Sequence, residues 1–167
     1  MTFAVRTATP DDGPNVSGLL QKSYSVLLQD AYDADLLARA LPLITTAQPL
    51  LLNCGTYYLA ITRDGRVVGA GGWTPQSPKG AQEAAATGHI RHFATDPDFA
   101  RLGIGRQLMD TCVSEATRAG LAELACFSTL NGEPFYATFG FRTVGRSDVE
   151  LPGGIVFPSL RMVKTLA

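Results

Sequence analysis

Hydrophobic and polar residues recur along this chain with two different periods, and each change of period marks a predicted element boundary. Phe3 to Arg6 alternates as a short strand does. Apolar residues then recur at helical spacing from Asn15 to Gln29. A second helix is predicted from Asp33 through Ile44, and Pro42 is expected to interrupt it.

The middle of the chain is predicted to be extended. Two apolar runs, Thr56 to Thr62 and Val67 to Trp73, flank the dipeptide Asp64-Gly65, which is a strong hairpin signal. The segment from Thr74 to Thr87 is rich in Pro, Gly, Ala and Ser and is predicted to be a long loop. Gly88 to Thr95 is predicted to be the next strand.

The last part of the chain alternates between strands and helices. The sequence predicts a helix over Ile104–Ala119, a strand over Leu121–Phe127, a short helix over Glu133–Phe139, and final strands near Phe141–Glu150 and Ile155–Val163. The strand–helix–strand order around residues 88–127 predicts a parallel crossover. The fold class is therefore predicted to be mixed α/β.

Composition favours one globular domain over residues 1–167. The chain has 167 residues, of which 46% are hydrophobic and 17% charged, so it can bury a core and is not expected to be disordered. The formal net charge is −1, with no basic patch. Nucleic acid is therefore not an expected partner. We saw no internal repeat and no domain linker.

The cysteines, the histidines and the first residues of the chain bear on whether a metal site or a signal peptide is expected. The three cysteines, Cys54, Cys112 and Cys126, have no C-x-x-C spacing, and there are only two histidines, so no metal site is expected. The first residues, MTFAVRTATPDD, do not resemble a signal peptide. No apolar run approaches the ~18 residues of a membrane span. We therefore expect a cytoplasmic protein with reduced thiols and no membrane partner.

The run Phe99-Ala-Arg-Leu-Gly-Ile-Gly-Arg106 is the most informative part of the sequence. It joins a predicted strand to a predicted helix. The first N–H groups of a helix have no internal partner, and the helix dipole places partial positive charge there. Glycines allow a large anion to approach that backbone, so the run suits a phosphate or diphosphate. An ordinary glycine-rich turn before a helix is the alternative.

Two known phosphate motifs do not fit this run. A P-loop requires a Lys followed by Ser or Thr after the glycines, and this pair is missing. A dinucleotide fingerprint requires a third glycine where Leu108 stands.

Three segments together resemble the GCN5-related N-acetyltransferases, a superfamily that uses acyl-CoA. IRHFATDPDFARLGIGRQLM (Ile90–Met109) resembles the family's acetyl-CoA strand, loop and helix. GEPFYATFGF (Gly132–Phe141) resembles its second motif, and VVGAGGW (Val67–Trp73) its substrate-side strand. Ala100 departs from the family's usual Gln or Arg. The resemblance implies a mixed sheet of six to seven strands with helices on both faces and a split between two parallel central strands.

The resemblance also implies acetyl-CoA as a cosubstrate. Loop amides would bind its diphosphate, with Arg101 or Arg106 supplying a cation, and backbone next to a bulged strand would pair with its pantetheine arm. Relatives often carry an Asn where Thr129 stands, and Asn131 lies two residues later. The implied coenzyme contacts are Phe93, Ala94, Thr95, Arg101, Leu102, Gly103, Ile104, Gly105, Arg106 and Asn131.

Tyr136 is the predicted general acid. In relatives the matching Tyr lies near the coenzyme sulfur, and a phenol with an ordinary pKa of about 10 is protonated at neutral pH. His89 matches the position of a base in some relatives, with His92 and Glu133 as reserves. We expect His92 to point away from His89 and Arg91 unless a bulge alters the alternation of the strand. For both Tyr136 and His89 a purely structural role is the alternative.

The acceptor is expected to be a small-molecule amine or a peptide. Tyr24, Tyr32 and Trp73 are the candidate substrate contacts, and each is equally well explained as a core aromatic. Direct transfer in a ternary complex is expected, and a covalent route through Cys126 is the alternative. A non-catalytic acyl-CoA sensor, or an enzyme acting on protein N-termini or lysines, are alternative functions. The sequence is compatible with a homodimer but does not determine the oligomeric state.

Overall fold

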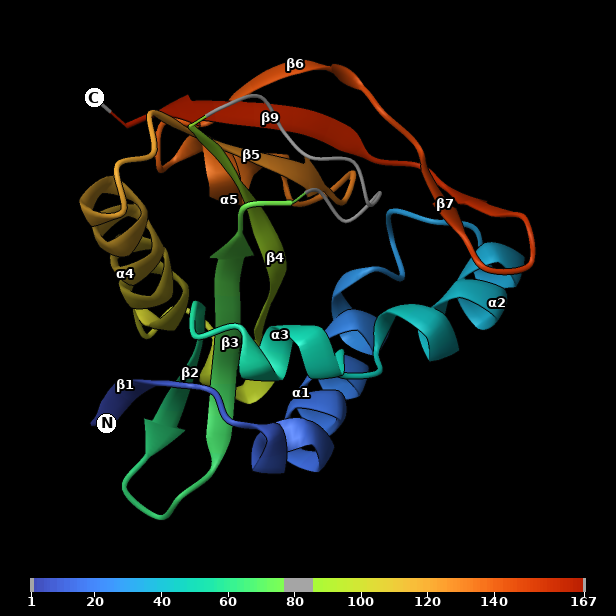
Figure 1. Cartoon of the computed structure of the whole chain (residues 1–167). Helices are drawn as coiled ribbons and strands as arrows, with labels where there is room; N and C mark the ends of the chain where they lie inside the picture. Colours follow the sequence, from blue (N-terminus) through green and yellow to red (C-terminus); the bar gives the residue numbers. More distant parts are fainter. Residues whose placement is uncertain (1, 77–85, 167) are drawn as a thin grey trace.

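A seven-stranded mixed sheet forms the centre of the molecule in the computed structural model, which describes residues 2–76 and 86–166 (Figure 1). The strand order is β1-β2-β3-β4-β5-β9-β6. β4 and β5 are parallel, and the other neighbouring strands are antiparallel. The strands are β1 (Phe3–Thr7), β2 (Tyr57–Thr62), β3 (Val67–Thr74), β4 (Thr87–Thr95), β5 (Glu123–Ser128), β6 (Arg142–Arg146) and β9 (Leu160–Thr165).

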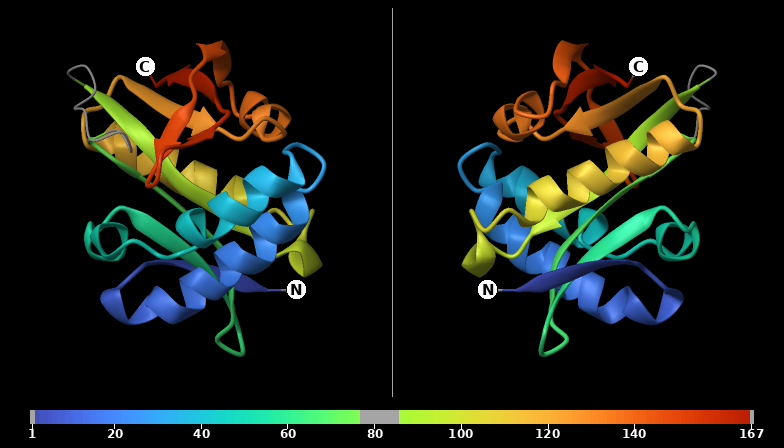
Figure 2. Two further views of the ribbon diagram at one scale, coloured as in Figure 1. Left: turned by 90° about the vertical axis from the view of Figure 1, so that its right-hand side faces the viewer. Right: turned by 90° about the vertical axis from the view of Figure 1, so that its left-hand side faces the viewer.

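Helices cover both faces of this sheet. The α-helices are α1 (Gly13–Leu27), α2 (Ala34–Ile44), α3 (Pro49–Asn53), α4 (Ile104–Arg118) and α5 (Glu133–Ala137), and short 3-10 turns lie at Pro10–Asp12 and Pro97–Phe99. α4 lies on one side of β3 and β4, and α1, α2 and α3 lie on the other (Figures 1 and 2). The mixed α/β class and the parallel crossover predicted from the sequence are therefore confirmed.

Each face of the sheet has its own apolar core. On the α4 side, Ile104, Leu108, Met109 and Cys112 are buried against the strands. On the opposite side, α1 and α3 bury a second set that includes Leu20 and Leu52. Because β2 and β3 are covered on both faces, most of their residues are buried and they do not alternate between apolar and polar residues.

The second helix departs from its prediction at Pro42. The proline lies inside α2 and does not interrupt it. It falls in the last turn, and the helix still closes beyond it because the backbone N–H and the hydroxyl of Thr45 both donate to the carbonyl of Leu41, at 3.1 and 2.6 Å. The five-residue helix α3 was not predicted.

The final strands also differ from the prediction. The two long strands expected there are four shorter ones, because the chain leaves the main sheet between β6 and β9 to form a hairpin of β7 (Val149–Leu151) and β8 (Ile155–Phe157). Pro158, which has no N–H to donate to a ladder, separates β8 from β9. The hairpin is held beside α2 by Phe157, whose ring stacks on Tyr32 with centroids 4.4 Å apart.

The long loop predicted between Thr74 and Thr87 is described only at its ends, and most of it lies outside the described residues. Across the two described ranges, every helix is too short or too polar to serve as a membrane span.

Asp12 gives the fold a measurable pH dependence. Its carboxylate accepts two hydrogen bonds from Arg6, at 2.8 and 2.9 Å, and one from the Thr9 N–H at 2.7 Å. The hydrogen bonds from Arg6 chiefly lower the pKa of Asp12 to about 2. Because this pKa lies below the unfolded value of about 3.9, ionised Asp12 stabilises the fold above that pH. This contribution is lost as the pH falls from about 4 towards 2.

We therefore expect Asp12→Asn to lower the free energy of unfolding by roughly 1 kcal/mol at neutral pH. The difference from wild type should shrink as the pH falls below about 4. Denaturant titrations over a pH series measure this, with the exposed neighbour Asp11→Asn as control. A difference that stayed constant down to about pH 2 would contradict the assignment.

Candidate functional site

The two parallel strands of the sheet separate soon after they meet. β4 pairs with β5 only through Thr87, Gly88 and His89, which lie opposite Glu123, Leu124 and Ala125. Beyond His89, β4 stays paired with β3 on its other side, and β5 stays paired with β9 as far as Ser128. The facing edges of β4 and β5 therefore form a wedge in the middle of the sheet. Their free backbone groups can pair with an extended ligand that enters it.

A β-bulge lies in β4 beside this wedge. Its pairing with β3 shifts register between Ala70 and Gly72, and His92 has a φ of 45°. Gly71 lies under the bulge, where an added Cβ would be 2.5 Å from the ring of Phe93. The bulge alters the alternation of the strand, since Arg91 and His92 both reach the same side chain, that of Gln48.

Two tyrosines hold the bulge in place. A bulge leaves some backbone groups without a partner in the sheet. Here the carbonyls of His92 and Phe93 accept hydrogen bonds from side chains instead. The hydroxyl of Tyr57 donates to the first at 2.9 Å, and that of Tyr24 to the second at 3.1 Å. Tyr24, a predicted substrate contact, therefore has a clear structural task at the wedge.

The start of α4 presents free amides. Arg101 and Gly103 have φ values of 63° and 83°, which turn the chain sharply into the helix. Gln107 donates to the carbonyl of Gly103 at 3.0 Å, so the amides of Ile104, Gly105 and Arg106 precede the first helical hydrogen bond. The side chains of Arg101, Leu102 and Arg106 are exposed around them. This is the backbone arrangement that the glycine-rich run predicts for an anion site.

Gly105 has a packing role that the motif alone does not reveal. A Cβ at this position would lie 2.8 Å from the ring of Phe135 on α5 and 3.9 Å from the hydroxyl of Thr95 at the end of β4. The absence of a side chain therefore brings the start of α4 close to both the split strand and α5.

Tyr136 lies where these parts meet. Its ring is 6.4 Å from that of Phe93 on the bulge and 5.6 Å from that of Phe141, measured between centroids. Burial raises the pKa of its phenol well above the ordinary value, so the hydroxyl stays protonated. No hydrogen bond of this hydroxyl is found among the described residues, which leaves its proton available to a ligand.

The candidate bases occupy different surroundings. His89 is fully buried at the last paired position of β4, with its ring 4.9 Å from that of Phe127. Burial lowers the pKa of His92 to about 4, and the Arg91 charge acts in the same direction, so its imidazole is neutral at physiological pH. Glu133 accepts a hydrogen bond from the hydroxyl of Thr143.

The remaining predicted contacts are engaged within the protein. The hydroxyl of Tyr32 donates to the carbonyl of Pro158 at 2.6 Å and accepts from the N–H of Leu130 at 2.9 Å. Trp73 is buried in the core on the α4 side. The amide of Asn131 donates to the carbonyl of Leu27 at 2.5 Å, tying the loop before α5 to the end of α1.

Cys126 lies on β5 in the same core. It is 1% exposed, and burial raises the pKa of its thiol to about 12. A neutral thiol is a poor nucleophile, so these surroundings do not support a covalent route. Within the described ranges, no group of three His, Cys, Asp or Glu side chains is arranged to hold a metal ion.

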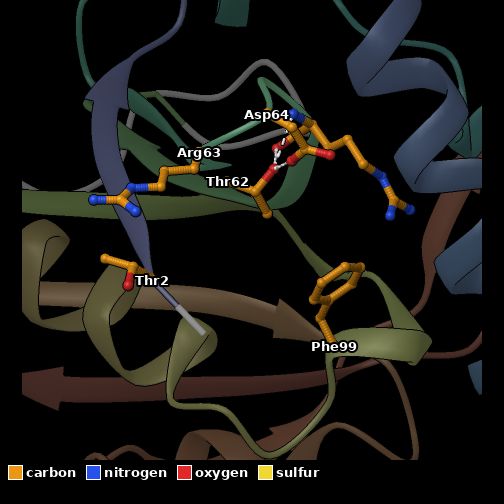
Figure 3. Close-up of a pocket in the computed structure, with 6 residues that line it drawn as sticks. Thr2, Thr62, Arg63, Asp64 and Phe99 are labelled. Carbon is orange, nitrogen blue, oxygen red and sulfur yellow. Dashed lines mark hydrogen bonds between the residues drawn. The ribbon is translucent and has the colours of Figure 1, made fainter.

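A shallow hollow lies elsewhere, at the hairpin between β2 and β3 (Figure 3). Thr62 donates to Asp64 there, and the side chain of Arg63 points away from this pair (Figure 3). The hollow is lined by residues at the hairpin turn together with Thr2 and Phe99, and it does not include the wedge, the start of α4 or Tyr136.

Three residues of the wedge were not singled out from the sequence, namely Gln48, Tyr57 and Arg91. Gln48 precedes an unpredicted helix, and Tyr57 is one of two adjacent tyrosines at the start of a strand. Arg91 had one available signal, because it is an arginine in the middle of a central strand, and arginine is rarely buried without a partner.

Residues 45–165 match a family model described as an acetyltransferase (GNAT) domain. The fold is similar to that of a GCN5-related N-acetyltransferase from Rhodopseudomonas palustris, with a TM-score of 0.78 and 22% identity over 99% of this chain and 97% of that one. It is also similar to the PaiA N-acetyltransferase from Thermoplasma acidophilum, solved in complex with coenzyme A, with a TM-score of 0.73 and 14% identity over 99% of each chain. A GNAT-family acetyltransferase from Staphylococcus aureus Mu50 gives a TM-score of 0.72 and 16% identity over 99% of this chain and 100% of that one. No curated protein matched the sequence.

The tyrosine contacts to the bulge can be tested by removing one hydroxyl. Tyr57 is 1% exposed, so Tyr57→Phe would leave the carbonyl of His92 buried without its donor. We expect the free energy of unfolding to fall by about 1–3 kcal/mol, measured by denaturant titration. Tyr58→Phe removes a hydroxyl from the adjacent buried tyrosine, which packs in the other core, and should cost less. Equal effects of the two substitutions would contradict a special role for Tyr57.

Proposed function

The chain belongs to the GNAT acetyltransferase family, and on that premise we propose that it transfers an acetyl group from acetyl-CoA to a primary amine. The family resemblance and the fold predicted from the sequence are both confirmed. One observation supports the proposal above the others. The wedge between β4 and β5 opens beside the free amides of α4, so a single extended ligand can reach both.

The coenzyme would use these two features together. The amides from Leu102 to Arg106 suit its diphosphate, because they combine free donors with the positive end of the helix dipole. The exposed side chains of Arg101 and Arg106 lie at the same turn and can add charge. The pantetheine arm has amides of its own, which can pair with the free edge of β4 between Phe93 and Thr95.

Transfer would then take place inside the wedge. The amine attacks the thioester carbonyl, and a backbone N–H of β4 can stabilise the negative charge that develops on its oxygen. When the carbon–sulfur bond breaks, the leaving thiolate takes a proton from the phenol of Tyr136. Burial keeps that phenol protonated and so able to donate. His89 remains the predicted base for the amine proton, although its full burial requires a route for that proton.

Release of free thiol from acetyl-CoA tests the reaction directly. The acceptor panel should cover amino acids, polyamines, aminoglycosides, arylamines and peptides.

With an acceptor identified, Tyr136→Phe should lower kcat by about 10–100-fold and raise the KM for acetyl-CoA by less, because the phenol acts on the leaving group. Tyr58→Phe is the control. A wild-type kcat in Tyr136→Phe would end the role of this residue as the acid. Coenzyme binding without release on any acceptor would favour a non-catalytic sensor.

The diphosphate site can be tested separately from the chemistry. Gly103→Glu places a carboxylate and added bulk where the diphosphate would bind, and we expect coenzyme A binding by calorimetry to be lost. Gly65→Glu is a matched control, since Gly65 has a φ of 87° against 83° for Gly103, and an added Cβ meets no atom within 4 Å at either position. The two variants therefore carry the same backbone strain. Unchanged affinity in Gly103→Glu would reject the assignment of the loop.

A further inference from the structure

Arg91 carries a positive charge into the middle of the sheet. It lies two residues beyond the point where β4 and β5 separate, on the face that packs towards α1 and α3. Both terminal nitrogens of its guanidinium are hydrogen-bonded. One donates to the hydroxyl of Thr74 and the other to the side-chain oxygen of Gln48, each at 3.1 Å. This side chain is therefore held in place, unlike a surface arginine that can move freely.

The described residues around Arg91 leave its charge without a counter-ion. Both of its hydrogen-bond acceptors are neutral, and no carboxylate within residues 2–76 and 86–166 forms an ion pair with it. Burial lowers the pKa of Arg91, which shows that the charged form is poorly solvated here. A partly buried charge without a counter-ion is unfavourable, and an anionic ligand would relieve it.

The geometry of the guanidinium favours a carboxylate. Arginine has five N–H donors, and each terminal nitrogen carries two of them. Thr74 and Gln48 take one from each terminal nitrogen, so each keeps one for a ligand. A carboxylate has two acceptor oxygens, so it can take up both of the remaining donors. The Nε atom is buried and has no partner among the described residues.

His92 adds a second unsatisfied donor beside Arg91. Gln48 accepts from Arg91 through its oxygen, so its amide nitrogen, 3.4 Å from Nε2 of His92, is the donor of that pair. Nε2 is then the acceptor, and the proton of the neutral imidazole lies on Nδ1. Nδ1 is buried and finds no acceptor in the described part of the chain. Among the described residues, the buried side-chain atoms left without a partner at this point are both donors, Nε of Arg91 and Nδ1 of His92.

We propose that Arg91 binds a carboxylate of the acceptor, so that the substrate is an amino acid or another amine that also carries a carboxylate. This inference rests on the proposed function. The free amides of α4 place the coenzyme on one face, and Arg91 lies on the other, so the two substrates would meet within the wedge. Arg91 and Phe93 lie two residues apart on β4, on either side of the bulge at His92. An amino acid would then bind with its carboxylate on Arg91 and its amine directed towards the thioester.

Thiol release with matched acceptors tests the proposal. Each amino acid is compared with its amide, which keeps the amine but lacks the charge and also mimics a peptide N-terminus. We expect kcat/KM for the best amino acid to exceed that of its amide by about 10–100-fold. Arg91→Gln should remove this preference by lowering the value for the amino acid, while the value for the amide and the KM for acetyl-CoA stay nearly unchanged.

Two further variants make the result decisive. Arg91→Lys keeps the charge but loses the paired donors, so it should retain part of the preference and confirms folding if Arg91→Gln is unstable. Arg39→Gln removes an exposed arginine from α2 and should behave as wild type. Equal rates with amino acid and amide, or an equal loss on both in Arg91→Gln, would overturn the carboxylate site and leave the acetyltransferase function standing. No release with any acceptor would overturn both.

Discussion

The separation of β4 from β5 is the constraint on which the rest of this molecule depends. Parallel neighbours normally stay hydrogen-bonded along their length, yet here pairing ends at His89. Backbone groups freed in this way must find other partners. The hydroxyls of Tyr57 and Tyr24 satisfy the two bulge carbonyls, and the facing edge of β4 is left for a ligand. The opening is therefore built into the sheet and does not depend on a moving loop.

The start of α4 is kept next to this opening by polar and packing contacts. Asp96, which follows β4, is 4% exposed and forms ion pairs with Lys22 at 2.9 Å and Arg66 at 3.8 Å. Its backbone N–H donates to Val68, so the end of β4 is tied to α1 and β3 together. Phe135 packs against Gly105 from the other direction. The amides of α4 are thus positioned before any coenzyme binds, which reduces the ordering cost of binding.

In the proposed reaction, one face of the sheet binds the coenzyme and the other binds the acceptor. The coenzyme side is built from backbone, and its recognition of a diphosphate needs few particular side chains. On the opposite face, the side chains of Arg91, His92 and Gln48 would determine which acceptor can bind. Selectivity for the acceptor can accordingly change without disturbing the coenzyme site, since the two sets of groups lie on opposite sides of β4.

The sequence by itself determined the order of the central elements, the glycine turn into α4 and the family, because these depend on local periodicity and on a short contiguous motif. It did not determine that bonds from Thr45 would close α2 beyond Pro42. Nor did it determine how the last strands divide, since that depends on the contact of Phe157 with the distant Tyr32. The tertiary structure alone decided that Arg91 and His92 share a face, because a bulge opposite Gly71 alters the alternation of β4. It also decided that Tyr24 and Tyr57 support that bulge, since their acceptors lie 69 and 35 residues away along the chain. No pattern of neighbouring residues encodes such a pairing.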